Sequence, residues 1–372
     1  MTSRGPIDPP TTRLPRLVAV GFQGFGNVGD EAILCGLERL LRGVATFDVI
    51  VAGTVAPAWA APAARRVHPW KLLPTPAAMR LIRRSDGLII SGGGLVNDYW
   101  PLVIPRYLAW VLAARLMGRP VVWAGIGVGP VRRLPWRVLA GLAFALSTSV
   151  LVRDHASESA ALKLFPAARV VMAADPAFAM EATPGVVRSG IGFIIRSPAP
   201  GDESHLPRLV DALAAAIIAL RGRGVPVDIL TMHPSEDEAM IAALQTSLRA
   251  VLPNGTCEAS EVRPLPPDPD AAAAALGGYE ALVTARLHGL ILGAVVGVPS
   301  VAIVYDAKVG AAAELLGLSD VAIPLDAVTG PRIGEALASL ADPGRGKQLA
   351  ERLRVQRDRL TVIRDTIARA AS

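Results

Sequence analysis

The chain has 372 residues, 52% of them hydrophobic, and a formal net charge of +6. Its length exceeds what one hydrophobic core usually supports, so we expect two domains. The basic balance suits an anionic partner. The arginines are dispersed and not interleaved with aromatic residues, and no nucleic-acid motif occurs, so we expect no nucleic-acid partner. The long apolar run over residues 102–128 contains three arginines, which favours buried helix and strand over a bilayer span.

Residues 1–15 are polar and proline-rich without an apolar centre, so we expect a disordered lead-in and no signal peptide. Alternating apolar strands and amphipathic helices then predict a Rossmann-like parallel α/β domain over residues 16–183. The predicted strands are 17–21, 48–52, 87–91, 121–125, 149–152 and 170–173, and the helices between them include 31–41 and 105–117.

The first predicted helix follows the glycine turn GFGNVGDE, residues 24–31, which satisfies the GxGxxG fingerprint of dinucleotide sites. Such a site also needs an acid at the end of the second strand, but Asp48 stands at the start of that strand. Asp30 at the helix start would moreover repel a pyrophosphate. We therefore disfavour a dinucleotide and expect Asn27 and Asp30 to bind the hydroxyls of an acceptor sugar.

A second glycine run, GGGLVND over residues 92–98, follows the predicted strand 87–91. Gly93 and Gly94 would bring bare backbone to the end of that strand. This arrangement suits either close approach of a ligand or a simple tight turn. We interpret the run as part of the acceptor side, with Asn97 and Asp98 as its functional members.

A short linker, ATPGVVRS over residues 182–189, precedes a second α/β domain predicted over residues 190–344. Its predicted strands are 191–195, 227–231, 257–261, 281–284, 300–304 and 321–324, and its predicted helices are 206–221, 236–251 and 270–276. An arginine-rich amphipathic helix over 349–370 forms most of a final segment, residues 345–372.

Ionisable residues follow two strands of this second domain. Arg286 and His288 come after strand 281–284, and Asp306 and Lys308 come after strand 300–304. Parallel sheets bind ligands at such strand ends, and arginine recognises carboxylate and phosphate. The alternative is an ordinary α/β turn with a surface arginine and a histidine that caps a helix.

Five motifs occur in this order: GNVGDEAIL, GGGLVND, the VRD of residues 152–154, DPAF at 175–178, and RLHG…GVP…YDAK. Together they resemble the polysaccharide pyruvyl transferase family over roughly residues 18–325. The resemblance implies two Rossmann-like domains in a GT-B-like fold, in which a C-terminal helix often packs back across both domains. It also implies transfer of a pyruvyl group from phosphoenolpyruvate to sugar hydroxyls, usually as a cyclic ketal.

This reaction needs an acid–base group and fixed positive charge around the donor. We assign His288 to the first role. Asp306 would orient His288 or accept a hydroxyl proton, and it could equally cap a helix. Arg286 and Lys308 would bind the donor. The resemblance adds Arg153 of the VRD motif, which by sequence alone would be a surface ion pair.

We expect no cofactor besides phosphoenolpyruvate as co-substrate, and no metal, because CxxC, HExxH and clustered metal ligands are absent from the sequence. The expected acceptor is a sugar or a lipid-linked glycan of a cell-surface polysaccharide. The expected location is cytoplasmic, with peripheral association at the inner face of the membrane left open. A nucleotide-sugar glycosyltransferase of the same fold and a non-catalytic glycan-assembly protein remain as alternatives.

Overall fold

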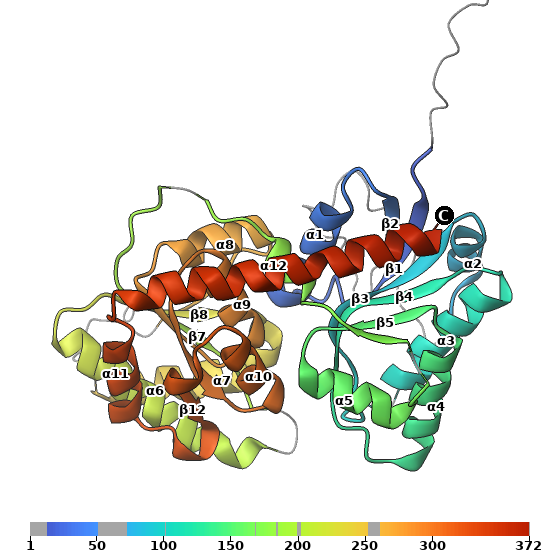
Figure 1. The fold of residues 1–372 in the computed structure, drawn as a ribbon. Coiled ribbons are helices and arrows are strands. Elements are labelled where there is room, and N and C mark those ends of the chain that lie inside the picture. The colour runs from blue at the N-terminus through green and yellow to red at the C-terminus, as the bar shows by residue number, and fades with distance from the viewer. Residues whose placement is uncertain are drawn as a thin grey trace, which may run out of the picture.

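The computed structural model describes residues 13–50, 73–100, 102–167, 169–183, 185–198, 202–251 and 261–371. Most of the predicted lead-in, and all but one residue of the predicted strand 257–261, lie outside these ranges. The described residues form two α/β domains side by side, each built on a six-stranded parallel sheet (Figure 1). The predicted fold class is therefore confirmed.

The first sheet has the strand order β2-β1-β3-β4-β5-β6. Its strands are β1 Arg16–Val20, β2 Thr46–Ile50, β3 Gly87–Val96, β4 Val121–Val128, β5 Ser149–Val152 and β6 Val170–Met172. The helices of this domain are α1 Val28–Leu41, α2 Pro76–Arg83, α3 Val103–Leu116, α4 Leu134–Leu146, α5 His155–Leu164 and the short 3-10 helix η1 Pro176–Ala179. β2 is added on one side of β1, and β3 to β6 are added on the other side, so the pair β1 and β3 marks the topological switch point of the sheet.

The glycine run after the third strand differs from the prediction. β3 continues through the glycines to Val96, and its register against β4 shifts between Gly93 and Val96. Gly93 has a φ of +113°, and a Cβ on Gly92 would lie 3.0 Å from the carbonyl oxygens of Ala124 and Gly125. The predicted turn is thus a β-bulge, because residues without side chains let two strands stay paired at close range.

The second sheet has the order β12-β11-β10-β7-β8-β9. Its strands are β7 Ile191–Ile195, β8 Val227–Thr231, β9 Val262–Pro264, β10 Ala281–Thr284, β11 Ser300–Val304 and β12 Ala322–Pro324. Its helices are α6 Leu206–Gly222, α7 Pro234–Val251, α8 Pro269–Gly277, α9 Leu287–Val295, α10 Ala307–Leu315 and α11 Gly330–Ser339, with short 3-10 helices η2 Glu203–His205, η4 Ser319–Val321 and η5 Leu325–Ala327. Its switch point lies between β7 and β10, and the strand that precedes Arg286 and His288 is β10.

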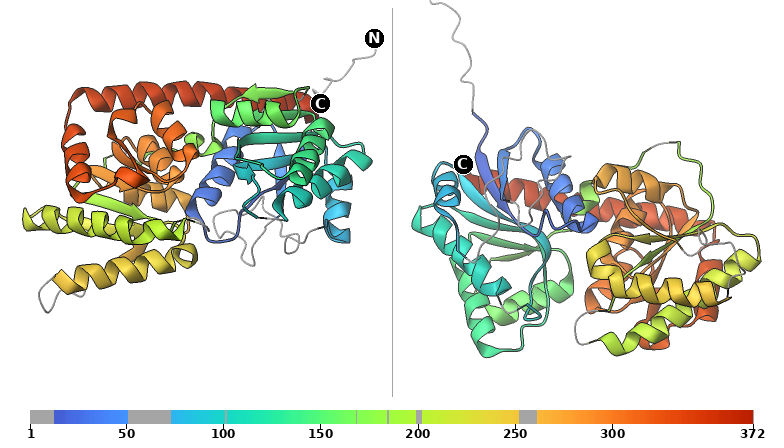
Figure 2. Two further views of the ribbon diagram at one scale, coloured as in Figure 1. Left: turned by 90° about the horizontal axis from the view of Figure 1, so that it is seen from below. Right: turned by 180° about the vertical axis from the view of Figure 1, so that it is seen from behind.

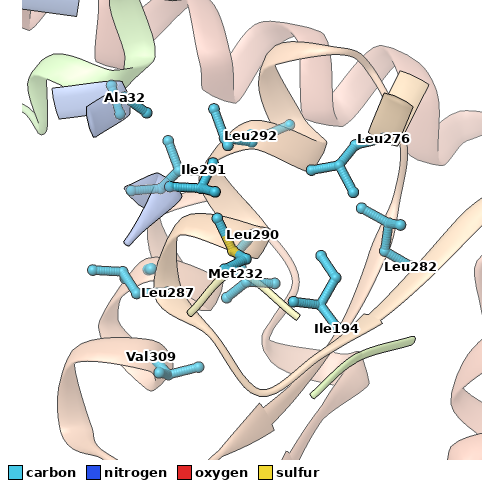
Figure 3. Packing of buried hydrophobic residues seen from close by; sticks show 14 of the residues in the cluster. Ala32, Ile194, Met232, Leu276, Leu282, Leu287, Leu290, Ile291, Leu292 and Val309 are labelled. Atoms are coloured by element: carbon cyan, nitrogen blue, oxygen red, sulfur yellow. The ribbon is translucent and has the colours of Figure 1, made fainter. Parts of the chain in front are cut away.

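A shared core joins the two domains. Buried side chains of α1, η1 and α9 belong to one continuous hydrophobic cluster. Figure 3 shows Leu290, Ile291 and Leu292 of α9 packed between the second sheet and Ala32 of α1. The backbone N–H of Val28 also donates to the carbonyl of Met232 in the second domain, at 3.1 Å. The domain junction is therefore part of the folded core.

The last helix, α12 Gly344–Ala371, runs across both domains (Figures 1 and 2). Leu360, Ile363 and Ile367 are buried in the shared core. The guanidinium of Arg357 donates to the carbonyl oxygens of Phe178 and Met180, at 3.2 and 2.9 Å. These contacts confirm that the C-terminal helix packs back across the domains. Within the described ranges, no helix combines the length and hydrophobicity that a bilayer span requires.

Candidate active site between the two sheets

The loops that follow the strands of the two sheets meet between the domains. His288 comes after β10 of the second sheet, and its Nε2 lies 3.6 Å from Oδ2 of Asp175, which comes after β6 of the first sheet. His233 comes after β8, and its Nε2 lies 3.1 Å from the carbonyl oxygen of Phe25, which follows β1. The carboxyl ends of the two sheets thus face one another, as in other open α/β sheets that bind ligands there.

His288 lies in the first turn of α9 with a side chain that is 12% exposed. Its Nε2 is buried and has no hydrogen-bond partner among the described residues, because the 3.6 Å to Asp175 is longer than a hydrogen bond. On its other side the ring lies against α1, where a Cβ on Gly29 would overlap Nδ1. Only glycine at this position allows the two helices to approach around the imidazole.

Asp175 joins His288 to Arg153. Arg153 is buried after β5, and its Nη1 donates to Oδ2 of Asp175 at 2.8 Å. The guanidinium lies over Gly127, where a Cβ would be 2.7 Å from Nη2. Burial favours the protonated carboxyl, but His288, Arg153 and the backbone N–H of Ala177 outweigh burial and lower the pKa of Asp175 to about 2. Asp175 is therefore ionised at every working pH.

Arg286 is held in a similar way by the second domain. Its Nη2 donates to Oδ1 of the buried Asp237 at 2.6 Å, and its Nη1 lies 3.7 Å from Oε2 of Glu236. Asp237 in turn accepts from the hydroxyl of Thr231 at 2.5 Å and from the backbone N–H of Ser197 at 3.0 Å. The Nε of Arg286 is buried without a hydrogen-bond partner among the described residues. The carboxylates orient the guanidinium, and its Nε is not used by either of them.

His233 forms the second contact between the domains. Its Nδ1 lies 2.8 Å from Oε2 of Glu236, while its Nε2 meets the carbonyl of Phe25. Burial favours the neutral ring, but the hydrogen bond and the charge of Glu236 outweigh burial and raise the pKa of His233. With a carbonyl and a carboxylate as its two partners, the ring is best satisfied when both nitrogens carry protons.

Asn27 and Asp30 lie at the start of α1, beside this cluster. The Oδ1 of Asn27 accepts from the backbone N–H of Gly29 at 3.1 Å, and its Nδ2 donates to Oδ2 of Asp30 at 2.9 Å. Asp30 is half-buried, and desolvation raises its pKa against the opposing charge of His288. A Cβ on Gly93 would lie 3.5 Å from Oδ1 of Asp30, so the bulge in β3 borders this carboxyl group. Asp30 thus shares its surroundings with His288.

Asp306 and Lys308 lie at the start of α10. Oδ1 of Asp306 accepts from the backbone N–H of Lys308 at 3.1 Å, and its Oδ2 lies 3.1 Å from Nζ of the same lysine. Asp306 therefore caps this helix, and the carboxylate that the structure places near His288 is Asp175. Nζ of Lys308 lies 5.6 Å from the centre of the Tyr305 ring, and Cζ of Arg196 lies 4.0 Å from the centre of the same ring.

The remaining residues predicted for the acceptor side bind their own backbone. Nδ2 of Asn97 donates to the carbonyl of Gly94 at 2.8 Å, and its Oδ1 accepts from Tyr99 N at 3.1 Å. Oδ2 of Asp98 accepts from the backbone N–H groups of Arg132 and Arg133, at 2.6 and 3.2 Å. These side chains shape the loop after β3, and their contact with an acceptor stays a prediction.

Three carboxylates and one arginine of this region were not predicted as site residues: Asp175, Glu236, Asp237 and Arg196. Asp175 could have been found, because it opens the DPAF motif directly after a strand. Asp237 lies in the first turn of a helix, where acids are common, and its pairing with Arg286 is a long-range contact. Across the described ranges, no group of three or more His, Cys, Asp or Glu side chains could hold a metal ion.

The family model for polysaccharide pyruvyl transferase matches residues 27–307, which include the motifs that supply Asn27, Arg153, Asp175, Arg286 and His288. The chain belongs to the polysaccharide pyruvyl transferase family. No protein among those with curated descriptions matches the chain in sequence.

Solved structures resemble this family member in fold. Anabaena Alr3699/HepE, solved with UDP, is 13% identical with a TM-score of 0.61, covering 95% of this chain and 98% of its own. UDP-GlcNAc 2-epimerase from Neisseria meningitidis, bound to UDP-GlcNAc, is 12% identical with a TM-score of 0.57, covering 95% and 100%. A mutant O-GlcNAc transferase of Thermobaculum terrenum is 16% identical with a TM-score of 0.52, covering 100% and 70%. At these identities the likeness concerns the fold alone.

Proposed function

We propose that the chain transfers a pyruvyl group from phosphoenolpyruvate to the hydroxyls of a sugar in a cell-surface polysaccharide or its precursor, forming a pyruvate ketal. The observation that carries this proposal is the convergence of Arg153, Arg286 and His288 at the facing sheet ends of a pyruvyl transferase family member. No cofactor or metal is part of the proposal.

The donor carries a phosphate and a carboxylate, so its site must offer several cationic donors. Arg286 keeps a buried Nε without a partner, and Arg196 keeps a buried Nη1 without one, among the described residues. Lys308 lies with Arg196 around the same tyrosine ring. The carboxylates paired with Arg153 and Arg286 fix the orientation of each fork, which favours bidentate binding of an incoming anion.

The reaction needs one proton delivered to carbon and two removed from oxygen. Protonation of the donor methylene makes the adjacent carbon electrophilic, and a sugar hydroxyl attacks that carbon and loses its proton. The carbon–oxygen bond to phosphate then breaks, phosphate leaves with the electron pair, and a second hydroxyl adds and loses its proton. The products are the ketal and inorganic phosphate.

We assign the proton transfers to His288 and Asp30. The carboxylate of Asp175 lies 3.6 Å from Nε2 of His288, and we assign this ring to accept the proton of the attacking hydroxyl. Desolvation raises the pKa of Asp30 and so favours its protonated form, which suits a donor of a proton to the methylene carbon. Asn27, hydrogen-bonded to Asp30, would hold the acceptor or the acid in place.

A donor screen tests the proposal. The protein is incubated with glycan acceptors and either phosphoenolpyruvate or a UDP-sugar, and released phosphate, released UDP and product mass are measured. We expect phosphate and a pyruvylated acceptor from phosphoenolpyruvate alone. Consumption of a UDP-sugar would instead support the nucleotide-sugar glycosyltransferase, which the UDP bound in the structurally similar Alr3699/HepE makes the second candidate. Consumption of neither donor would favour a non-catalytic role.

A further inference from the structure

An apolar stripe lies on the solvent side of α4. Leu134, Val138 and Leu142 are spaced four residues apart and are 71%, 60% and 43% exposed. The opposite side of the same helix is buried in the core of the first domain through Ala143 and Phe144. A helix that covers a sheet normally presents polar residues to water, so the outer stripe is not explained by folding of this domain.

A second exposed apolar group adjoins the start of α4. Trp100 and Leu102, just before α3, are 56% and 52% exposed. α3 packs beside α4 at the outer side of the first domain, away from the second domain (Figures 1 and 2). The side chain of Asp98 binds backbone N–H groups just before α4, which ties the segments that precede the two helices together.

Positive charge surrounds this apolar surface. Arg132, Arg133 and Arg137 are exposed and form no ion pair with a carboxylate that the structure describes. The sequence over residues 73–147 contains nine arginines and two acids, Asp86 and Asp98. Two carboxylates against nine arginines leave a clear excess of positive charge over this segment.

We propose that this surface docks on an anionic lipid bilayer. We name it the α4 surface: Trp100, Leu102, Leu134, Val138 and Leu142, with Arg132, Arg133 and Arg137. Apolar side chains that insert at the headgroup boundary, combined with arginines that face anionic lipid, are the two contributions that hold peripheral proteins on membranes. A second copy of the chain fits less well, because a two-fold contact would bring the same arginines together.

The position of the α4 surface gives docking a use. The starts of α3 and α4 follow β3 and β4, at the carboxyl end of the first sheet, which is the end that faces His288. A protein docked there would hold the mouth of the site near the bilayer, within reach of a sugar carried on a lipid. This last step rests on the proposed function, whereas docking itself does not.

Vesicle co-sedimentation tests the docking without donor or acceptor, so its outcome is independent of transfer activity. The full chain is mixed with vesicles of phosphatidylcholine alone or of phosphatidylcholine with phosphatidylglycerol. We compare wild type, the triple variant R132Q/R133Q/R137Q, the variant L134S/V138S, and a matched control, R352Q/R364Q/R369Q, which removes the same charge from the exposed side of α12.

We expect the wild type to bind the mixed vesicles, and its affinity to fall about fivefold for each arginine removed from the α4 surface. L134S/V138S should lose less affinity, and this loss should not depend on salt because the contribution removed there is apolar. The control on α12 should bind within about twofold of wild type. Equal losses in the two triple variants would overturn the proposal, because they would show that net charge alone drives binding. Absence of binding to mixed vesicles would also overturn it, as would a wild-type dimer that L134S/V138S converts to monomer.

Discussion

Two carboxyl groups near His288, both supplied by the first domain, have opposite surroundings. Asp175 lies beside His288 and accepts hydrogen bonds from Arg153 and from the backbone N–H of Ala177. Together these three neighbours lower the pKa of Asp175 to about 2. Asp30 has an amide, Asn27, as its side-chain partner, and desolvation raises its pKa. Cations and N–H donors therefore decide which carboxyl stays ionised.

This difference gives the two groups different uses. An ionised Asp175 can stabilise a positively charged ring but cannot donate a proton. Asp30 can carry a proton to higher pH and release it to a reacting carbon. Pairs of titratable groups with pKa values moved in opposite directions are typical of acid–base sites. The comparison predicts four outcomes, which we give from the largest effect to the smallest.

The largest effect is expected from His288→Ala, because His288 is assigned to the proton transfer and both Asp175 and Asp30 lie near its ring. Pyruvyl transfer should fall by about 10² to 10⁴-fold, while the melting temperature and most of the donor affinity remain. Steady-state rates and donor titration measure this. His155→Ala is the control, because His155 is exposed on α5. Turnover within a few-fold of wild type would remove His288 from the chemical step.

Asp175→Asn should reduce both activity and stability. Loss of the carboxylate removes the charge 2.8 Å from the buried Arg153 and leaves Asp154, 3.6 Å from its Nε, as the remaining carboxylate, so the cost is at most about 3–5 kcal/mol of unfolding free energy. Because the pKa of Asp175 is lowered, its stabilising effect is complete above about pH 4 and fades as the pH falls toward 2. Denaturant unfolding at several pH values should therefore show the gap between variant and wild type closing in acid. A gap that does not change with pH would contradict the assignment.

Asp30→Asn should behave in the opposite way. Because the pKa of Asp30 is raised in the folded protein, the folded state loses stability as the pH rises above the ordinary pKa of an aspartic acid. An uncharged Asn avoids that cost. We expect unchanged or slightly higher stability at neutral pH and a rate reduced by up to about 10²-fold. The alkaline limb of the pH–rate profile should flatten. An unaltered profile would assign Asp30 to binding alone.

Chelation should have the smallest effect. The proposed donor site uses Arg153, Arg196, Arg286 and Lys308 to neutralise phosphate, so a divalent ion is not required. Transfer should survive prolonged EDTA treatment followed by assay in metal-free buffer. Loss of transfer that Mg²⁺ or Mn²⁺ restores would show that a metal takes part, and would strengthen the glycosyltransferase alternative.

Strand positions were predictable because apolar runs bounded by glycine and proline carry that information locally. β5, β7, β8, β10 and β11 have the predicted bounds. The extension of β3 was missed, because glycines predict a turn unless the neighbouring strand is known to pair with them. The residues at the strand ends near the site were predicted from their positions, including Arg286 and His288.

The pairing of these residues could not be predicted. The sequence offers Asp306 as a neighbour for His288, since both follow adjacent strands, but the structure places Asp175 of the other domain there. The pairing of Arg286 with Asp237 could not be predicted either, because Asp237 lies on α7, far from Arg286 in the sequence. Such contacts depend on how two domains dock and on side-chain direction, and neither leaves a periodic signal in the chain.

The most direct test of the central claim is the reaction run in deuterated water. The methylene of phosphoenolpyruvate becomes the methyl group of a ketal only by taking up one proton from an acid–base group that exchanges with solvent, so the methyl group of the product should contain one deuterium. Mass spectrometry and proton NMR of the pyruvylated acceptor measure this. We predict one deuterium per methyl group in the wild-type product, and at least about 10²-fold less product from His288→Ala in the same time. A pyruvylated product without deuterium, or a product that contains no pyruvyl group, would contradict the account.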